Sequence, residues 1–297
     1  MRKVELSKER LGYLLVIPAL AVVIGIFLYP FITTLWYSLH SMRLNVPHLG
    51  TPWVGIKNYL LLFGFNRFLY ALRFTVFFAV VGVSLQLILG IGVALTLHKH
   101  FRGRSAVRVS VLAPWAICLV VAALMWKWMY NASYGIINSV FLQMGLLNQP
   151  FDWLGANATW AIISSLIATV WRDSPFVAIV VLAGLQSIEL NLYDAAEIDG
   201  GNRFQVFRFI TLPLLKPAIL VVLLFQTIHE IRAFDLIFAL TQGGPGNATE
   251  LASLFVYKFT FSFLDFGRGS AAAVVLASLT MILCLIYMRF LFKDEVS

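Results

Sequence analysis

Six apolar stretches, each long enough to cross a lipid bilayer as a helix, constrain the fold of this chain more than any other feature of its sequence. A helix needs about 20 mostly apolar residues to span the hydrocarbon. Of the 297 residues, 60% are hydrophobic and only 12% are charged, which is too few charges for the surface of an ordinary soluble domain. We therefore predict an all-α polytopic membrane protein with six transmembrane helices, at residues 11–28, 74–97, 109–129, 160–185, 218–240 and 270–291.

The basic residues predict how these helices are oriented. Lys and Arg cluster before the first stretch, between the second and third, and between the fourth and fifth, and Arg289 and Lys293 lie at the end of the chain, whereas residues 130–159 contain none. Cytoplasmic connections carry such an excess, so we predict that both termini are cytoplasmic. We attribute the net charge of +8 to these basic cytoplasmic connections, and we expect no nucleic acid partner. Four basic residues in the first outer connection depart from this pattern: Arg43, Lys57, Arg67 and Arg73.

The chain divides into a cytoplasmic tail at 1–10, one transmembrane domain at 11–292 and a cytoplasmic tail at 293–297. Its start is basic and then apolar, like a secretory signal peptide, but no clear small-x-small cleavage pattern follows and five further apolar stretches do. We interpret it as a retained first span. Cys118 and Cys284 both fall inside apolar stretches, so neither a disulfide nor a metal site is predicted.

The longest inner connection, residues 186–216, is longer than a simple link between two spans requires. We predict two short helices in it, with Asp194 near the positively polarised N-terminus of the first. Gly200 and Gly201 form the break between them, because glycine tolerates backbone conformations that other residues avoid. Asn202 is then the expected N-cap of the second helix.

The second of these helices carries an apolar stripe. Phe204, Phe207 and Ile210 recur at helical spacing, and Pro213 with Pro217 is expected to end the helix before the next span. An apolar stripe on a cytoplasmic segment needs a partner, which is either the edge of the membrane or another protein.

The same connection resembles the cytoplasmic loop of ATP-binding-cassette importer permeases, whose pattern is Glu-Ala-Ala-x-x-Asp-Gly-Ala, five residues, and Phe-x-x-Ile-x-Leu-Pro. Asp194 replaces the Glu, and Gly201 replaces the last Ala of the first half. The resemblance implies the type I importer permease fold and a coupling loop, residues 186–216, that inserts into a groove on an ATPase subunit. The alternative is an amphipathic loop that lies on the bilayer. The matching positions are Ala195, Ala196, Asp199, Gly200, Phe207, Ile210, Leu212 and Pro213.

The resemblance also implies partners. The chain has no Gly-x-x-x-x-Gly-Lys-Ser/Thr phosphate-binding loop, so we expect a non-catalytic subunit whose ATP is hydrolysed elsewhere. It is expected to bind no cofactor itself, while two separate ATPase subunits use ATP and Mg. The other expected partners are a second, homologous permease in a heterodimer, an extracytoplasmic sugar-binding protein and the lipid of a prokaryotic cytoplasmic membrane.

Two outer segments narrow the substrate class. Thr241, Gly243, Gly244 and Pro245 belong to a Leu-Thr-x-Gly-Gly-Pro element, and residues 53–59 form a second element. Both resemble segments of sugar-importer permeases, most closely those of the maltose, trehalose and glycerol-phosphate branch. They imply a carbohydrate cargo, transport by alternating access and a contact surface for the binding protein. A different solute class stays open, as does a role in merely stiffening the loops.

Polar residues within the predicted spans are candidates for the substrate pathway. Ionisable side chains in hydrocarbon are costly and usually face a cavity or the interior of a helix bundle. Arg172 and Glu230 lie at depths that differ by about 3 Å, so they can pair across adjacent helices. The candidates are Arg172, Asp173, Gln226, His229, Glu230, Arg232 and Asp235.

A rotation of about 100° per residue separates the candidates of the fifth span into two sets. Gln226, His229 and Glu230 fall on one side of the helix, and Arg232 and Asp235 fall on another. One narrow cavity is therefore not expected to contact all of them. We expect one set to line the sugar path, while the other, such as a pair between Arg232 and Asp235, locks the helix packing. Buried ion pairs that hold the bundle together are the alternative for each charged residue.

Two other function classes fit less well. A self-contained secondary transporter needs its own ion-coupling site and often repeats broken helices in two halves, and no internal repeat is evident in the sequence. An intramembrane enzyme needs a catalytic motif such as His-Glu-x-x-His or Gly-x-Ser-x-Gly, and the sequence contains neither.

Overall fold

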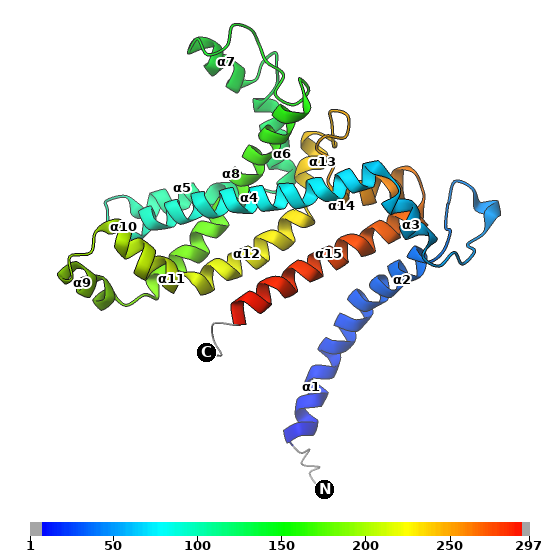
Figure 1. Cartoon of the computed structure of the whole chain (residues 1–297), viewed down its shortest axis with the longest axis horizontal. Helices are drawn as coiled ribbons and strands as arrows, with labels where there is room; N and C mark the ends of the chain where they lie inside the picture. The colour runs from blue at the N-terminus through cyan, green and yellow to red at the C-terminus, as the bar shows by residue number, and fades with distance from the viewer. Residues whose placement is uncertain (1–7, 293–297) are drawn as a thin grey trace, which may run out of the picture. The chain divides into compact units, whose positions relative to one another are not determined.

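The computed structural model describes residues 8–292, and within them every regular element is a helix (Figure 1). The predicted tail 293–297 lies outside the described residues, as do the first seven positions of the predicted tail 1–10. In chain order the elements are α1 Lys8–Val23, η1 Ile24–Leu28, α2 Tyr29–Ser38, η2 Pro47–Leu49, α3 Lys57–Phe63, α4 Asn66–His98, α5 Arg104–Ala116, α6 Leu119–Met129, α7 Ile136–Gln143, α8 Ala158–Gln186, α9 Leu190–Ile198, α10 Arg203–Val206, η3 Phe207–Thr211, α11 Leu212–Leu214, α12 Lys216–Ile231, α13 Asp235–Leu240, α14 Ala252–Tyr257, η4 Lys258–Ser262 and α15 Phe266–Phe292.

Within the described residues, the helices agree with the predicted number of spans. Four helices are long and apolar enough to cross a membrane by themselves, and two pairs of bent helices pass the same test of length and composition together. The number of spans is six if each bent pair is one span. The side of the membrane that each terminus faces stays a prediction. The four single helices are Leu15–Ser38, Asn66–His98, Ala158–Gln186 and Phe266–Arg289.

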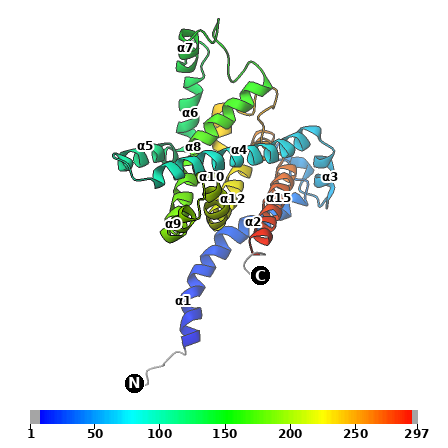
Figure 2. The same ribbon diagram turned by 60° about the vertical axis from the view of Figure 1, so that its left-hand side comes forward.

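The third predicted span, residues 109–129, is not one straight helix. α5 ends at Ala116, and α6 continues from it at an angle of 97° (Figure 2). Pro114 stands in the last turn of α5 and lacks the N–H that would continue the helical hydrogen bonds. Ile117 then adopts an extended backbone, with a ψ of 134°. The helix therefore breaks in the middle of its apolar run.

The fifth predicted span, residues 218–240, is also interrupted. Residues 232–234, between α12 and α13, are not helical, although none of them is Pro or Gly. The hydroxyl of Ser253 donates a hydrogen bond to the backbone carbonyl of Ala233 within this break. A side chain from elsewhere in the fold thus satisfies a carbonyl that a continuous helix would have used internally.

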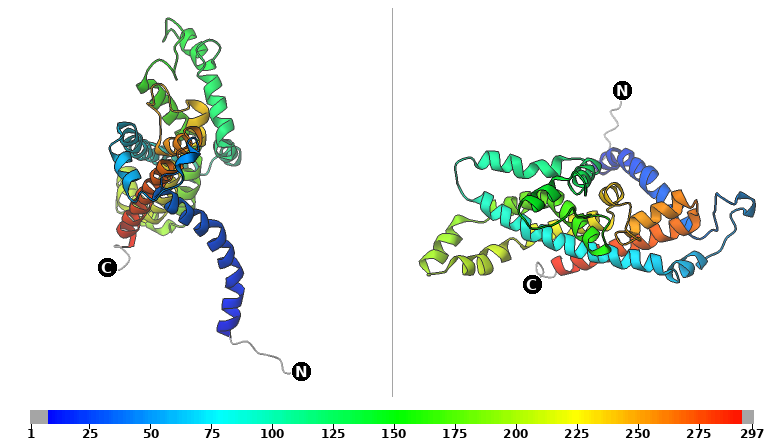
Figure 3. Two further views of the ribbon diagram at one scale, coloured as in Figure 1. Left: turned by 90° about the vertical axis from the view of Figure 1, so that its right-hand side faces the viewer. Right: turned by 90° about the horizontal axis from the view of Figure 1, so that it is seen from above.

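The described residues form two compact units, one of residues 8–66 and 256–275 and the other of residues 67–255 and 276–292. In the second unit, α4, α8 and α12 pack around a shared apolar core (Figures 1 and 3). The buried residues of this core are Ala94, Leu97, Val177, Val181, Leu182, Leu185, Leu215 and Val222.

Small residues allow these helices to approach closely. A Cβ atom placed on Gly184 of α8 would lie 2.8 Å from the Cβ of Ala218 on α12, which is too close for two carbon atoms. Gly92 of α4, in contrast, has open space where a Cβ would stand. Glycine at position 184 is therefore needed for helix packing, as is common between helices in membranes.

Two of the four basic residues that depart from the charge bias are ion-paired. In the first unit, the guanidinium of Arg43 lies 3.2 Å from a carboxylate oxygen of Asp265. In the second unit, Arg67 donates two hydrogen bonds to the buried carboxylate of Glu250, at 2.6 and 2.7 Å. Glu250 thus offsets the charge of Arg67, whereas the carboxylate of Asp265 is shared by Arg43 and Arg268.

Candidate functional site

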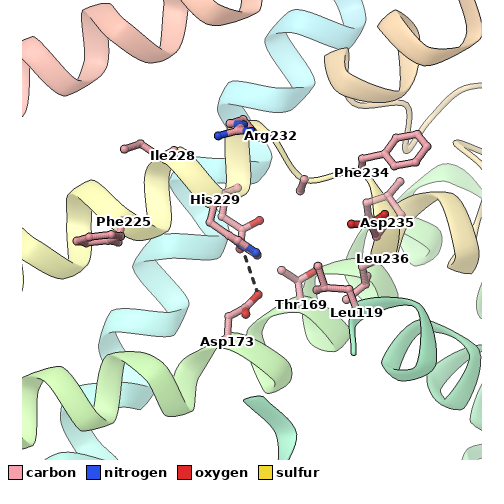
Figure 4. A pocket seen from close by; sticks show the side chains of 13 residues that line it. Leu119, Thr169, Asp173, Phe225, Ile228, His229, Arg232, Phe234, Asp235 and Leu236 are labelled. Carbon is pink, nitrogen blue, oxygen red and sulfur yellow. Dashed lines mark ion pairs between the residues drawn. The ribbon is translucent and has the colours of Figure 1, made fainter. Parts of the chain in front are cut away.

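A cavity of about 420 Å³ lies beside the break between α12 and α13 (Figure 4). Its wall combines charged side chains with aromatic and aliphatic ones. The lining residues are Leu119, Thr169, Asp173, Phe225, Ile228, His229, Glu230, Arg232, Ala233, Phe234, Asp235, Leu236 and Ile237.

The helix break brings members of both predicted polar sets of the fifth span to this one cavity. His229 and Glu230 on α12 line it, and so do Arg232 and Asp235 beyond the end of that helix. Gln226 does not line the cavity, so the prediction that one cavity does not contact all five residues agrees with the structure, but members of both sets border it and the expected separation into a path set and a packing set is not seen. A rotation of 100° per residue applies only while the helix continues, and α12 ends at Ile231.

The predicted pair between Arg232 and Asp235 is likewise wrong. No ion pair joins the two side chains within the described residues. An i,i+3 spacing brings side chains together only on a continuous helix, and residues 232–234 are not helical. Both residues instead border the cavity.

Arg172 pairs with its neighbour in the sequence and not with Glu230. Its guanidinium forms an ion pair with Asp173, and in the described structure no ion pair joins it to Glu230. Oε1 of Glu230 instead accepts a hydrogen bond of 2.6 Å from Nε2 of Gln86. The predicted pair of Arg172 and Glu230 fails because similar depth does not determine which way each helix turns its side chains.

Gln86 is a residue of this site that the sequence reasoning missed. It is fully buried on α4, and its Oε1 accepts a hydrogen bond of 2.9 Å from Nε2 of Gln226 on α12. Gln226 also lies 3.5 Å from the backbone carbonyl of Asp173 on α8, so the two amides connect three helices. The sequence feature that could have identified Gln86 is a glutamine inside a long apolar stretch, because polar side chains in spans often hydrogen-bond across helices.

Asp173, His229 and Glu230 converge on one side of the cavity. The side chains of Asp173 and Glu230 are buried, whereas His229 is 38% exposed and reaches the open space. Nδ1 of His229 lies 3.9 Å from Oδ2 of Asp173, as the dashed line in Figure 4 marks. The arrangement offers carboxylate oxygens and an imidazole nitrogen to a bound molecule or ion.

The predicted coupling loop, residues 186–216, contains the expected turn between two helical segments. Gly200 has a φ of +77°, a left-handed conformation that favours glycine. Asn202 caps α10 as predicted, in a capping box in which it exchanges hydrogen bonds of 2.8 and 2.9 Å with Gln205. The capping residues therefore determine the local fold of this loop.

Two details of this loop differ from prediction. α9 begins at Leu190, so Asp194 lies in its second turn and not at its positive end. A π-helical turn, η3, which was not predicted, follows α10, and along the predicted stripe Phe204 is exposed whereas Phe207 and Ile210 are half-buried. Among the motif residues, Asp194, Ala195, Asp199 and Gly200 are exposed, and Ala196, Phe207, Ile210, Leu212 and Pro213 are half-buried.

The coupling loop nevertheless presents large apolar side chains. Ile198, Phe204 and Phe209 are 86%, 74% and 73% exposed. A cavity of about 600 Å³ lies between this loop and the ends of α4 and α8, lined among others by Tyr193 and Phe207. An exposed apolar surface with an adjacent hollow fits a protein partner or the bilayer, and both alternatives stay open.

The predicted outer element is held together by its own hydrogen bonds. The hydroxyls of Thr241 and Thr249 lie 2.7 Å apart, and Thr249 donates a bond of 2.8 Å to the carbonyl of Gly244. Gly243 has a φ of +88°, and the peptide bond between Gly244 and Pro245 is cis. Thr241, Gly244 and Pro245 also border a further cavity of about 480 Å³. These contacts are compatible with a stiff loop and with a binding surface.

Comparison with known proteins identifies the family. The sequence profile of the family described as "Binding-protein-dependent transport system inner membrane component" matches residues 86–295. The chain belongs to this family. This inner membrane component is therefore a membrane protein, as the apolar helices predict.

Similar proteins cover nearly the whole of this inner membrane component. It is 40% identical over 287 residues to the trehalose/maltose transport system permease protein MalF of Thermococcus litoralis, with 97% of this chain and 95% of the relative covered. It is 35% identical over 290 residues to the sulfoquinovosyl glycerol transport system permease protein SmoG of Agrobacterium fabrum, with 98% and 93% covered.

The fold is also that of a solved transporter. A chain in the crystal structure of a bacterial alginate ABC transporter, in complex with an alginate pentasaccharide-bound periplasmic protein, superimposes with a TM-score of 0.81. The two chains share 22% sequence identity, and the match covers 96% of this chain and 94% of the other. The ABC importer permease fold predicted from the loop motif is thereby confirmed.

Proposed function

We propose that this chain is the membrane-spanning permease subunit of an ATP-binding-cassette importer whose cargo is a carbohydrate. The observation that carries the proposal is the 40% identity, over 97% of the chain, to a permease named for trehalose and maltose. A second relative is named for a sugar glycoside, which supports a disaccharide or a similar glycoside as the substrate class. Transport then proceeds by alternating access.

The cavity beside the helix break supplies the groups that a sugar needs when it leaves water. Each hydroxyl that loses a water molecule needs a replacement hydrogen bond. Asp235 offers acceptors, and Arg232 offers donors. Phe225 and Phe234 add apolar surface for the C–H face of a sugar ring. This mixture of apolar walls and a few polar groups is typical of small-molecule sites.

The coupling loop transmits ATP-driven movement in this proposal. Its exposed Ile198 and Phe204 flank the turn at Gly200, and they provide apolar surface for a groove on an ATPase subunit. The second helical segment, Arg203–Leu214, leads directly into α12 at an angle of 64°, so movement of the loop passes to α12 in this proposal. The residues of this loop that match the permease motif are therefore proposed as coupling residues.

The proposal includes partners that complete the transporter. The related alginate transporter binds a periplasmic protein that carries its cargo, and we extend such a partner to this chain. A second permease and two ATPase subunits that use ATP and Mg complete the assembly. The present chain is proposed to be non-catalytic and to bind no nucleotide.

The test uses the full chain, purified together with the transporter subunits that bind it and reconstituted into membrane vesicles. The measurement is uptake of radiolabelled trehalose and maltose by these vesicles. We expect uptake to require ATP and to persist when an ionophore removes the proton gradient. Asp235→Asn and Phe225→Ala should each lower uptake about tenfold, the effect of losing about 1.4 kcal/mol. Phe77→Ala, at an exposed ring outside the cavity, is the matched control. Uptake driven by the proton gradient without ATP would contradict the proposal and favour a secondary transporter.

A further inference from the structure

Three polar atoms at the cavity lack a hydrogen-bond partner within the described residues. They are Oδ2 of Asp173, Nδ1 of His229 and Oε2 of Glu230, and each atom is buried. Asp173 and Glu230 as residues are 2% and 0% exposed. A buried polar atom without a partner is costly, so the convergence of three such atoms requires an explanation.

The other oxygen of each carboxylate is already occupied. Oδ1 of Asp173 pairs with Arg172, and Oε1 of Glu230 accepts the hydrogen bond from Gln86. One ligand atom therefore remains on each carboxylate, and one remains on His229. The neighbouring contacts hold both carboxylates in place, as outer partners do around metal ligands.

The spacing of the three free atoms suits a shared cation better than a direct hydrogen bond. The ligand atoms of the three residues lie within 4.8 Å of one another. Nδ1 of His229 and Oδ2 of Asp173 are 3.9 Å apart, which is too far for a hydrogen bond. Two ligands that each lie about 2.0–2.2 Å from one metal ion in a tetrahedral site stand about 3.3–3.6 Å apart. A cation between them needs only small rotations of the side chains.

The ligand types and charges identify the class of cation. One imidazole nitrogen and two carboxylate oxygens suit zinc and similar divalent ions. The two carboxylates are only partly offset by the guanidinium of Arg172, and Arg232 and Asp235 at the same cavity offset each other. A divalent cation thus enters a site with an excess negative charge.

We propose that Asp173, His229 and Glu230 bind a divalent cation of the zinc class, with an open coordination position toward the cavity. His229 provides the route of entry, because its side chain is 38% exposed while the two carboxylates are buried. The proposal does not depend on the cargo of the transporter. The sequence predicts no metal site, because His229 and Glu230 are adjacent in the sequence but only folding brings Asp173 of α8 to them.

The test measures metal bound to the full chain, purified without a histidine tag, stripped with a chelator and dialysed against buffered Zn²⁺. We expect one ion per chain. Asp173→Asn and His229→Gln should each weaken binding by about 100-fold or more, since even outer partners of a metal are worth 10- to 100-fold. His48→Gln, at an exposed histidine that does not line the cavity, is the matched control and should leave binding unchanged.

X-ray absorption of the zinc-loaded wild type provides a second measurement that does not depend on how the variants fold. We expect nitrogen and oxygen ligands at about 2.0–2.2 Å and the scattering of one imidazole. No saturable binding, equal binding by folded His229→Gln, or a sulfur-containing shell would each overturn the proposal. In that case a proton held by His229 between the two carboxylates becomes the better account of the three atoms.

Discussion

Replacement of Gln86 by leucine tests whether the buried amides hold α4, α8 and α12 together. Gln86 is fully buried, and its amide donates to Glu230 and accepts from Gln226. Leucine has nearly the same volume but no polar atoms, so Gln86→Leu removes both hydrogen bonds without opening a large cavity. We expect the variant to fold with a lower free energy of unfolding.

The contacts set the size of the effect. A hydrogen bond to a charged group contributes about 1.5–3 kcal/mol, and Glu230 loses one. A buried donor without a partner costs about 1–3 kcal/mol, but Gln226 keeps its 3.5 Å contact with the carbonyl of Asp173. Hydrogen bonds between helices in a membrane average about 0.6 kcal/mol, because the unfolded chain finds other partners there. With two hydrogen bonds lost, these values bracket the expected loss at about 1–4 kcal/mol.

The assay is reversible unfolding in mixed micelles, followed by tryptophan fluorescence. A double-mutant cycle with Glu230→Gln isolates the interaction between the two side chains, and we expect a coupling energy of about 1 kcal/mol or more. Ser84→Ala is the matched control, because Ser84 is exposed on the same helix and its hydroxyl donates to the carbonyl of Val80 within that helix. Its free energy of unfolding should change by less than about 0.5 kcal/mol.

Two results would refute this reasoning. One is a free energy of unfolding for Gln86→Leu within about 0.5 kcal/mol of the wild type. The other is simple additivity of Gln86→Leu and Glu230→Gln in the cycle, since additivity is the behaviour of independent sites. Either result would mean that the amides are adjacent to Glu230 without stabilising it.

The remaining predictions concern packing, coupling and topology. Gly184→Ala should lower the free energy of unfolding by about 1–3 kcal/mol through overpacking against α12, whereas Gly92→Ala, which faces open space, should be neutral or stabilising; equal effects in the same unfolding assay would contradict the packing account. Gly200→Val should abolish substrate-stimulated ATP hydrolysis in an assembled transporter because its φ of +77° excludes a branched side chain, and unchanged stimulation would reject the coupling role. In a cysteine-free background, a membrane-impermeant thiol reagent should label a cysteine at Asn247 from outside and one at Glu197 only from inside; the reverse pattern would overturn the predicted orientation.

The number of spans and the local fold of the coupling loop follow from the sequence. Apolar stretches of sufficient length must be helical in a membrane, because only a helix or a closed barrel satisfies its backbone there. Gly200 and Asn202 act through contacts with their immediate neighbours, so their roles in the turn and the cap are also visible in the sequence. The orientation of the chain and the roles of the motif residues stay predictions.

The arrangement of the polar site is decided by the tertiary structure. Helical periodicity separates His229 from Asp235, but the break after α12 places both at one cavity. No residue type within the break forbids a helix, and the carbonyl of Ala233 within it accepts a hydrogen bond from Ser253, 20 positions further along the chain. The partner of Glu230 is likewise Gln86, 144 positions away in the sequence. Spacing along one helix predicts which residues share a face, but the packing of neighbouring helices decides where that helix ends and what each face meets.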